Sequence, residues 1–179
     1  MARQKGIGGL PSAEEVRRRL DYDPETGIFR WKWRNDVRAC DNSRKAGKIA
    51  GSSSGSHGYT SIDFAPHGPL LAHRLAFVWM TGEWPFHQTD HIDGTRTNNR
   101  WANLREATKA QNMQNVGLRS NNTSGINCVI PHKKSGRWRV VVTANGKVHH
   151  GGYFDTIEEA KAARDAVARR LHGKFARTD

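Results

Sequence analysis

The feature that most constrains the fold is a polar stretch in the middle of the chain with few core-forming residues. It reads Asp90-His91-Ile92-Asp93-Gly94, then Asn98-Asn99, Asn103-Leu104-Arg105 and Gln111-Asn112. Such a stretch is not present for hydrophobic burial alone, because Asp, Asn and Arg rarely lie in a core. Its side chains therefore indicate either turn formation or chemistry.

The charge of the whole chain points to a polyanionic partner. Its 179 residues include 29 Lys and Arg against 17 Asp and Glu, a net charge of +12. Neutralising DNA phosphates releases counterions, which favours binding by a basic protein. An ordinary basic soluble protein remains the alternative, since charge does not separate binding from cutting.

The chain carries no membrane or secretion signal. No apolar run approaches the roughly 18–20 residues of a spanning helix, and residues 1–11 lack the apolar core of a signal peptide. We therefore expect no membrane partner and a cytoplasmic location.

Local patterns predict short elements before the polar stretch. Ser12-Ala13-Glu14-Glu15 has the form of a capping box, which starts a helix. Residues 23–27 indicate a turn, while 28–33 and 59–64 alternate like strands. Residues 73–80 form an apolar helical pattern that Gly82 should end.

The polar stretch itself predicts a strand, a loop, a strand and a helix. Asp93-Gly94 favours a turn after a strand, and 104–107 can return as its partner. Thr108 begins a capping box, so a helix should start at Lys109 with Asn112 one turn inside it.

Metal-assisted phosphodiester hydrolysis needs the residue types found here. Asp90 and Asn112 can supply oxygens to a hard cation such as Mg²⁺, and a neutral His91 can deprotonate water. Asn103 can bridge the two strands and orient the His91 ring. The same residues also suit ordinary turns. Neighbours on a regular strand point to opposite faces, so Asp90 and His91 converge only where the strand bulges or ends.

With this spacing, the residues resemble the HNH endonuclease motif in its His-Asn-Asn form. Asn103 follows His91 by twelve residues, and Asn112 lies nine further on. The resemblance to phage and intron-encoded homing-type enzymes extends upstream. It includes residues 20–29 and His73-Arg74-Leu75-Ala76, followed by Gly82 and Pro85.

The resemblance implies a ββα-metal fold that hydrolyses DNA and leaves 5′-phosphate and 3′-hydroxyl ends. His91 is then the general base, Asp90 and Asn112 hold one divalent ion, and Asn103 supports His91. Because Asn112 stands where many relatives have His, Mg²⁺ or Mn²⁺ is the expected ion.

Two further expectations concern the surroundings of this motif. Arg96 and Arg105 are expected to contact DNA. Many HNH proteins hold a structural zinc on paired Cys-x-x-Cys motifs, but this chain has only Cys40 and Cys128, so we expect no structural zinc. The upstream strands and the helix at 73–80 must then brace the segment.

The C-terminal region predicts a hairpin covered by a helix. Asn145-Gly146 is a two-residue hairpin signal that pairs Ala144 with Lys147, Thr143 with Val148 and Val141 with His150. One face carries Arg137, Arg139, Val141, Thr143, Val148 and His150. The other carries Trp138, Val140 and Val142, which the helix begun by Thr156-Ile157-Glu158-Glu159 can cover through Ile157, Ala160, Val167 and Leu171.

This region resembles the AP-two/ethylene-response-factor DNA-binding domain over about fifty residues. The resemblance lies in Ser124-Gly125-Ile126, Gly136-Arg137-Trp138-Arg139, Asn145-Gly146-Lys147, Gly152-Tyr153-Phe154-Asp155-Thr156, Glu158-Glu159-Ala160 and Leu171-His172-Gly173-Lys174-Phe175-Ala176. It implies a three-stranded sheet in the major groove of DNA. The expected contacts are Lys133, Lys134, Arg137, Arg139, Thr143 and His150. Asn127-Cys128-Val129 departs from the family pattern at the start of the first strand. An ordinary solvated sheet face is the alternative.

The prediction as a whole is an α+β protein with three segments. Residues 1–89 form an N-terminal region with antiparallel strands that supports the nuclease. Residues 90–118 form the ββα-metal motif, and 119–179 form a three-stranded antiparallel sheet packed on one helix. We expect a monomeric endonuclease acting on double-stranded DNA, with one Mg²⁺ or Mn²⁺. The alternatives are a non-catalytic DNA-binding regulator with a degenerate HNH site and a nuclease acting on RNA or as a toxin.

Overall fold

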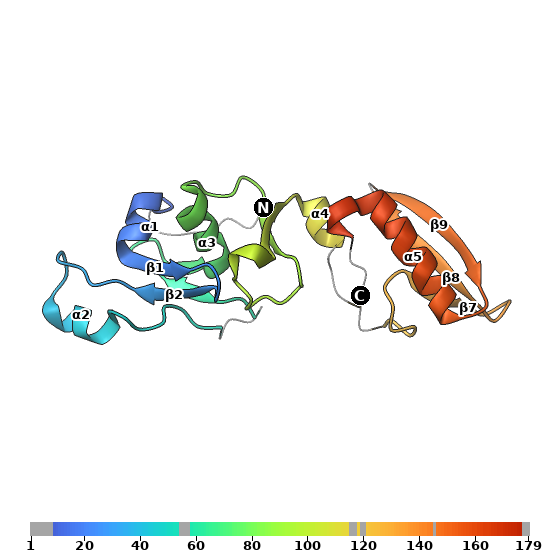
Figure 1. Ribbon diagram of the computed structural model, residues 1–179, viewed down its shortest axis with the longest axis horizontal. Coiled ribbons are helices and arrows are strands. Elements are labelled where there is room, and N and C mark those ends of the chain that lie inside the picture. Colours follow the sequence, from blue (N-terminus) through green and yellow to red (C-terminus); the bar gives the residue numbers. More distant parts are fainter. Residues whose placement is uncertain (1–8, 54–57, 115–117, 119–120, 145, 177–179) are drawn as a thin grey trace. The chain divides into compact units, whose positions relative to one another are not determined.

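The computed structural model describes residues 9–53, 58–114, 118, 121–144 and 146–176. They belong to two compact units, Met1–Glu106 and Ala107–Asp179, each described by itself (Figure 1). The first contains short two-stranded sheets and helices, and the second contains a three-stranded sheet with one long helix. This confirms the predicted α+β class. The boundary between the units falls inside segment 90–118, and the division into three segments stays a prediction.

The first unit begins with a helix at the predicted place, followed by a hairpin whose turn and second strand were predicted and whose first strand was not. Helix α1 (Ala13–Arg19) starts at Ser12, whose side chain accepts a hydrogen bond from the Glu15 amide. Strands β1 (Leu20–Asp23) and β2 (Ile28–Trp31) pair antiparallel around the predicted turn at 23–27. Strand β2 ends two residues earlier than the alternation suggested.

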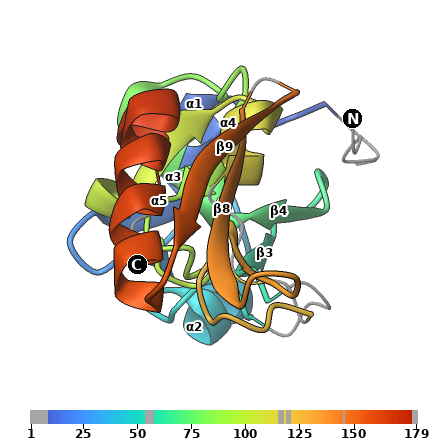
Figure 2. The same cartoon turned by 90° about the vertical axis from the view of Figure 1, so that its right-hand side faces the viewer.

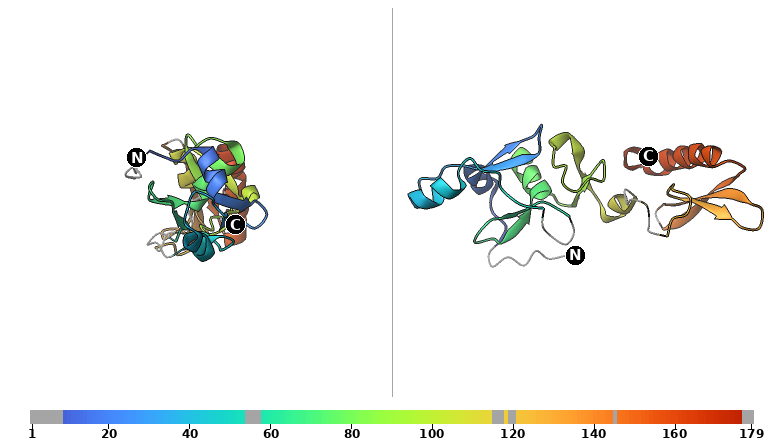
Figure 3. Two further views of the ribbon diagram at one scale, coloured as in Figure 1. Left: turned by 90° about the vertical axis from the view of Figure 1, so that its left-hand side faces the viewer. Right: turned by 90° about the horizontal axis from the view of Figure 1, so that it is seen from below.

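Two of the next four elements match the sequence patterns, and the other two were not predicted. The predicted strand β3 (Ser61–Asp63) pairs with β4 (Pro69–Leu71), which was not predicted, and the predicted helix α3 (Ala72–Thr81) follows and ends at Gly82. Helix α2 (Ala39–Lys45) was not predicted, because no side chain caps its first turn. It lies at one end of the first unit in the right-hand view of Figure 3.

The core of the first unit joins α1, both hairpins and α3. Its large, fully buried side chains are Leu20, Phe29, Ile62, Phe64 and Leu75. Burying each such side chain contributes about 1.5–3 kcal/mol. Leu104 belongs to the same cluster, so the polar segment is attached to this core.

The polar segment forms the predicted order of strand, loop, strand and helix. Strand β5 (Gln88–His91) pairs with β6 (Leu104–Ala107), and the short 3-10 helix η1 (Trp101–Asn103) precedes β6. Helix α4 (Lys109–Gln114) follows Thr108, whose hydroxyl accepts from the Gln111 amide as in a capping box.

The second unit is one sheet and one helix. Strands β7 (Val129–His132), β8 (Arg137–Ala144) and β9 (Lys147–Phe154) pair in that order and antiparallel. Helix α5 (Ile157–His172) runs alongside β8 and β9 (Figure 2) and is followed by the 3-10 helix η2 (Gly173–Phe175). Among the helices in the described parts of the chain, none has the length and apolar content to cross a membrane.

The hairpin register agrees with the prediction at all three predicted pairs. Ala144 faces Lys147, Thr143 faces Val148 and Val141 faces His150. Asn145 of the turn lies outside the described residues. The predicted packing of the helix on the sheet is also found. Val140, Val142 and Ala160 are buried, and the partly buried side chains that pack against them include Trp138, Val167 and Leu171.

A bulge interrupts β9, and the alternation did not predict it. The register shifts between Val140 and Val141, which leaves Gly151 as the extra residue. A Cβ atom at Gly151 would lie 2.5 Å from Val140 Cγ1, so only glycine passes this side chain without displacement.

Candidate functional site

Asp90 and His91 are buried together at the end of a strand. Strand β5 stops at His91, and the Gly94 amide donates to the His91 carbonyl in the turn that follows. Asp90 is 5% exposed and His91 4% exposed. The strand therefore ends at His91, and a strand end was one of the two conditions under which these neighbours can face the same site.

Asp90 is paired with Arg105 of the neighbouring strand β6. Arg105 Nε donates a hydrogen bond to Asp90 Oδ2 at 2.8 Å, and Arg105 Nη2 lies 2.7 Å from the same oxygen. Both side chains are largely buried. Arg105 was predicted to contact DNA. In the structure its guanidinium pairs with the buried Asp90 carboxylate and offsets that negative charge.

The His91 ring has a defined amide partner that the sequence analysis did not identify. Its Nε2 lies 3.1 Å from Asn99 Oδ1, and Asn99 is itself 3% exposed. In the sequence, Asn98-Asn99 indicated only a turn. The available signal was the adjacent asparagine pair itself, which lies in a stretch already rich in the residue types that metal-assisted hydrolysis needs.

Two further rings surround His91. His73 of α3 packs edge-on against it with ring centroids 5.0 Å apart, and Tyr59 lies 5.1 Å from His73 and 6.0 Å from His91. The guanidinium of Arg96 lies 5.1 Å from the Tyr59 ring centre. Arg96, a predicted DNA contact, is exposed and lies against this aromatic cluster through Tyr59.

His73 is held in its neutral form by its surroundings. Burial, with smaller effects from His91 and Arg74, lowers the pKa of His73 to about 3. A second positive charge beside the His91 ring is thereby avoided.

Asn103 organises the loop between the two strands. Its Oδ1 accepts from the Asp93 amide at 3.0 Å, and its Nδ2 donates to Asp93 Oδ1 and to the Asn98 carbonyl, each at 2.9 Å. Its own carbonyl accepts from the Ile92 amide. The predicted bridge between the strands is therefore present, and it acts on the loop that follows His91.

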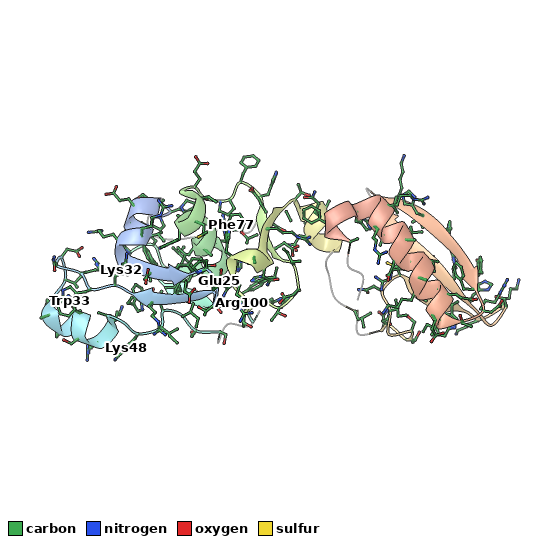
Figure 4. The ribbon with its side chains drawn as sticks, in the orientation of Figure 1. Glu25, Lys32, Trp33, Lys48, Phe77 and Arg100 are labelled. Carbon is green, nitrogen blue, oxygen red and sulfur yellow. The ribbon has the colours of Figure 1, made fainter. Side chains whose placement is uncertain are left out.

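The upstream elements brace this loop, as the lack of a zinc motif led us to expect. The Trp101 amide donates to the Pro24 carbonyl at 2.9 Å, and the Trp101 ring packs 4.9 Å from that of Phe77 in α3. Figure 4 labels Glu25 and Arg100 where the β1–β2 turn meets the loop.

The donor atoms suit a hard divalent cation. Asp90 offers carboxylate oxygen beside His91, and Asn112 offers amide oxygen from α4. Asn112 belongs to the second unit, so its distance to Asp90 stays a prediction. Among the described residues, no three His, Cys, Asp or Glu side chains gather as a metal-binding group.

The second unit presents the predicted basic face on the side of the sheet away from α5. Arg139 Nη2 lies 3.1 Å from His150 Nδ1, so these two predicted contacts touch each other. Thr143 is exposed on the same face, and Lys133 and Lys134 are exposed in the turn before β8.

Arg137 on this face is engaged by an acidic residue. It donates to both carboxylate oxygens of Asp155, at 2.7 and 3.0 Å, which raises the pKa of Arg137 and lowers that of Asp155. Both side chains are substantially exposed, and such pairs contribute little to stability. Asp155 can therefore be exchanged for another anion.

The same face carries exposed apolar and aromatic residues: Val148, which the prediction placed there, and Ile130 and Tyr153, which it omitted. Ile130, Val148 and Tyr153 are each about half exposed, at 46%, 57% and 46%. Ile130 and Tyr153 both flank Arg139 across the sheet. The bulge at Gly151 puts Tyr153 on this face.

Comparison with known proteins finds a family match over the segment that contains the first of these sites. A family model described as HNH endonuclease matches residues 70–114. Protein 3.8 of Escherichia phage T7 is 37% identical over 103 residues, which cover 56% of this chain and 84% of that protein. The uncharacterized HNH endonuclease L560 of Acanthamoeba polyphaga mimivirus is 31% identical over 111 residues, covering 61% of this chain and 57% of that protein.

One solved structure also aligns with the chain. It is a structure titled "DNA binding and cleavage by the HNH homing endonuclease I-HmuI", with a TM-score of 0.43, 17% identity and 90% coverage of both chains. The matched family segment contains His73, Asp90, His91, Asn103 and Asn112. From the extent of its match to protein 3.8 and from the family segment, the chain belongs to the family of that phage protein and is an HNH endonuclease.

Proposed function

We propose that the protein hydrolyses phosphodiester bonds of double-stranded DNA with His91 as general base. The observation that carries this proposal is the buried Asp90–His91 pair at the end of β5, whose histidine ring is held by an amide inside the HNH-matched segment. The net charge of +12 supports a nucleic-acid substrate.

The reaction takes one water and cleaves one P–O bond. His91 accepts a proton from the water as the water oxygen bonds to phosphorus. The P–O3′ bond then breaks, so the products carry a 5′-phosphate and a 3′-hydroxyl, whose proton comes from solvent. His91 returns its proton to solvent before the next turnover.

Asp90 and Asn112 would hold one Mg²⁺ or Mn²⁺ at this site. A bound divalent ion supplies electrostatic stabilisation for the phosphorane-like transition state and for the leaving oxygen. Arg105 orients the Asp90 carboxylate, because Nε and Nη2 both lie within hydrogen-bond distance of Oδ2.

The sheet of the second unit would direct cutting to sites in duplex DNA. A three-stranded sheet with Arg139, His150 and Thr143 on its open face suits the major groove, which accepts a β-ribbon. The AP-two/ethylene-response-factor likeness of this region supports the same assignment. A-form RNA hides its major groove, so this reader favours DNA.

A single catalytic histidine cuts one strand in each binding event. We therefore propose a monomer that nicks DNA, acting in the cytoplasm of a bacterial or phage-infected cell. The three segments 1–89, 90–118 and 119–179 would correspond to support, catalysis and recognition.

Incubation of supercoiled plasmid with the protein and Mg²⁺, with and without EDTA, tests this function. The proposal predicts relaxed circles that require the metal and are absent with His91→Ala. Retarded but uncut plasmid with the wild-type protein would instead indicate the non-catalytic DNA-binding regulator. Cleavage in saturating EDTA would contradict the metal site.

A further inference from the structure

The hydrogen bond between His91 and Asn99 defines which ring nitrogen carries the proton. Asn99 Nδ2 donates to the Thr97 carbonyl at 3.4 Å, which turns Oδ1 toward the ring. An amide oxygen only accepts, so the His91 Nε2 that lies 3.1 Å from it must be the donor. In the neutral ring the lone pair is then on Nδ1.

This tautomer matters because only the nitrogen with the lone pair accepts a proton from water. A histidine that acts as a base is commonly held by a hydrogen bond to its other nitrogen, which sets both ring angle and tautomer. Asn99 makes that bond here, from a position eight residues after His91.

Asn99 is itself held in place from the N-terminal hairpin. The Tyr22 hydroxyl of β1 donates to the Asn99 carbonyl at 2.6 Å, across 77 residues of sequence. Burial raises the pKa of the Tyr22 hydroxyl, so it remains a donor at all physiological pH values.

Gly27 of the same hairpin allows the close approach that this contact needs. It has a φ of +73°, and a Cβ atom there would lie 2.4 Å from the Asn99 carbonyl carbon and 2.5 Å from the Arg100 nitrogen. The hairpin turn and the catalytic loop are therefore in direct backbone contact, and no side chain fits between them.

We propose that Asn99 is a positioning residue for His91, and that Tyr22 and Gly27 hold Asn99 so that His91 presents Nδ1 as the base. Asn103 has the separate task of shaping the loop through Asp93 and Asn98. The proposal rests on the proposed function of His91 in the chemical step.

The first test compares three variants of these residues in single-turnover cleavage of a DNA duplex at saturating protein. Asn99→Leu removes the acceptor and should slow cleavage on the order of 10²-fold, with the dissociation constant for DNA within about twofold of wild type. Asn99→Asp keeps an acceptor and should recover most of that loss. Tyr22→Phe should slow cleavage less, by about three- to tenfold, because Asn99 keeps its bond to the ring.

Two matched controls separate positioning from folding. Asn42 of α2 is also a buried asparagine, 4% exposed, whose amide bonds to the backbone of Arg34. The Thr81 hydroxyl, like that of Tyr22, donates to a backbone carbonyl, that of Phe77. Asn42→Leu and Thr81→Val should lower the melting temperature without changing the cleavage rate measured well below it.

The second test reads the tautomer without any cleavage. Long-range ¹H–¹⁵N spectra of the imidazole in the full chain should show His91 protonated at Nε2 in the wild type and in Asn42→Leu. Asn99→Leu should show a mixture of both tautomers. An Nδ1–H form in the wild type, or an Asn99→Leu variant with wild-type tautomer and wild-type rate, would overturn the proposal.

The two tests also distinguish this proposal from the proposed function. If His91→Ala cuts as fast as wild type, His91 is not the base and the proposed function fails. The spectra still decide in that case whether Asn99 holds the ring in one tautomer. If His91→Ala is inactive while Asn99→Leu is fully active, only the positioning role fails.

Discussion

The two units position their functional residues in different ways. In the second unit, the open sheet face arises from alternation along one hairpin, and its side-chain contacts Arg139–His150 and Arg137–Asp155 join residues only 11 and 18 positions apart. In the first unit, the proposed catalytic histidine is held by Asn99, and Asn99 is held by Tyr22 from a hairpin 77 residues away. The proposed recognition surface is thus locally encoded, while the proposed catalytic centre is assembled by tertiary contacts.

This difference predicts different consequences for substitutions in the two units. Changes on the sheet face should alter DNA affinity and leave the chemical step intact. Changes in the network around His91 should alter the chemical step and leave affinity intact. The following experiments test that separation in order of the size of the expected effect.

The largest effect is expected for His91→Ala. Loss of a general base costs about 10²–10⁴-fold in rate, because the water then attacks without proton removal. DNA affinity should stay within about twofold, measured by fluorescence anisotropy on the same duplex used for cleavage. A large loss of affinity would mean that His91 also contributes to binding and would break the separation.

The next effect concerns the pH dependence of stability in the first unit. The folded pKa of His73 is about 3, so between pH 6.5 and 3 the unfolded chain binds a proton that the folded unit does not. Stability should therefore fall as pH is lowered below about 6.5, by up to about 1.4 kcal/mol per pH unit.

Urea unfolding measures this effect through tryptophan fluorescence. Five of the six tryptophans lie in the first unit, so the signal reports mainly on it. The measured quantity is the change in the free energy of unfolding with pH between pH 6.5 and 4.5, above the ordinary carboxyl range. This change should be smaller in His73→Gln than in the wild type, and it should persist in His132→Gln of the second unit. An equal change in wild type and His73→Gln would show that His73 titrates normally.

Gly151→Ala should destabilise the second unit by about 1–3 kcal/mol, because its Cβ atom would lie 2.5 Å from Val140 Cγ1. Calorimetry should show one transition shifted down and the transition of the first unit unchanged. Gly146→Ala has no atom within 4 Å of its added Cβ and serves as the comparison, although its φ of +74° also costs some stability. A shift of both transitions in Gly151→Ala would show that the units unfold together.

Arg139→Ala should weaken DNA binding and flatten its salt dependence. Each lost phosphate contact lowers the slope of log affinity against log salt by about 0.9, and Arg137→Ala should behave in the same way. Lys161→Ala on the exposed surface of α5 removes an equal charge and should leave the slope unchanged. Cleavage at saturating protein should remain at the wild-type rate, and an unchanged slope in Arg139→Ala would remove that residue from the phosphate contacts.

The smallest effect is expected for Asp155→Asn. It releases Arg137 from an exposed ion pair, which contributes little to stability. Melting temperature should hardly change, while DNA affinity should rise a few-fold because a competing carboxylate is lost. A lower affinity would mean that Asp155 orients Arg137 for binding.

Most elements could be predicted because their signals lie within a few residues. Ser12 and Thr156 start helices through their own side chains, and both cap hydrogen bonds are found. The Asn145-Gly146 signal set the register of β8 and β9 without knowledge of the rest of the chain. The bulge at Gly151 was not predicted, because the close approach of Gly151 to the Val140 side chain on the neighbouring strand is a tertiary contact that alternation along one strand does not show.

The candidate site was predictable in its residue types and less so in its contacts. The spacing of Asp90, His91 and Asn103 located the segment that the family model matches. The pairing of Arg105 with Asp90 and of Asn99 with the His91 ring was not predicted. Many polar side chains in this stretch can satisfy the same donors and acceptors, and spacing does not choose among them.

The sequence alone determined most of the elements, the hairpin register and the segment that contains the candidate site, because hydrophobic alternation, capping residues and turn residues act over short distances. The tertiary structure decided which partners the catalytic side chains have. Tyr22, Gly27 and His73 reach the loop of His91 only after the core of the first unit has formed. Hydrogen bonds and ring contacts between distant residues depend on that packing, and no local pattern encodes it.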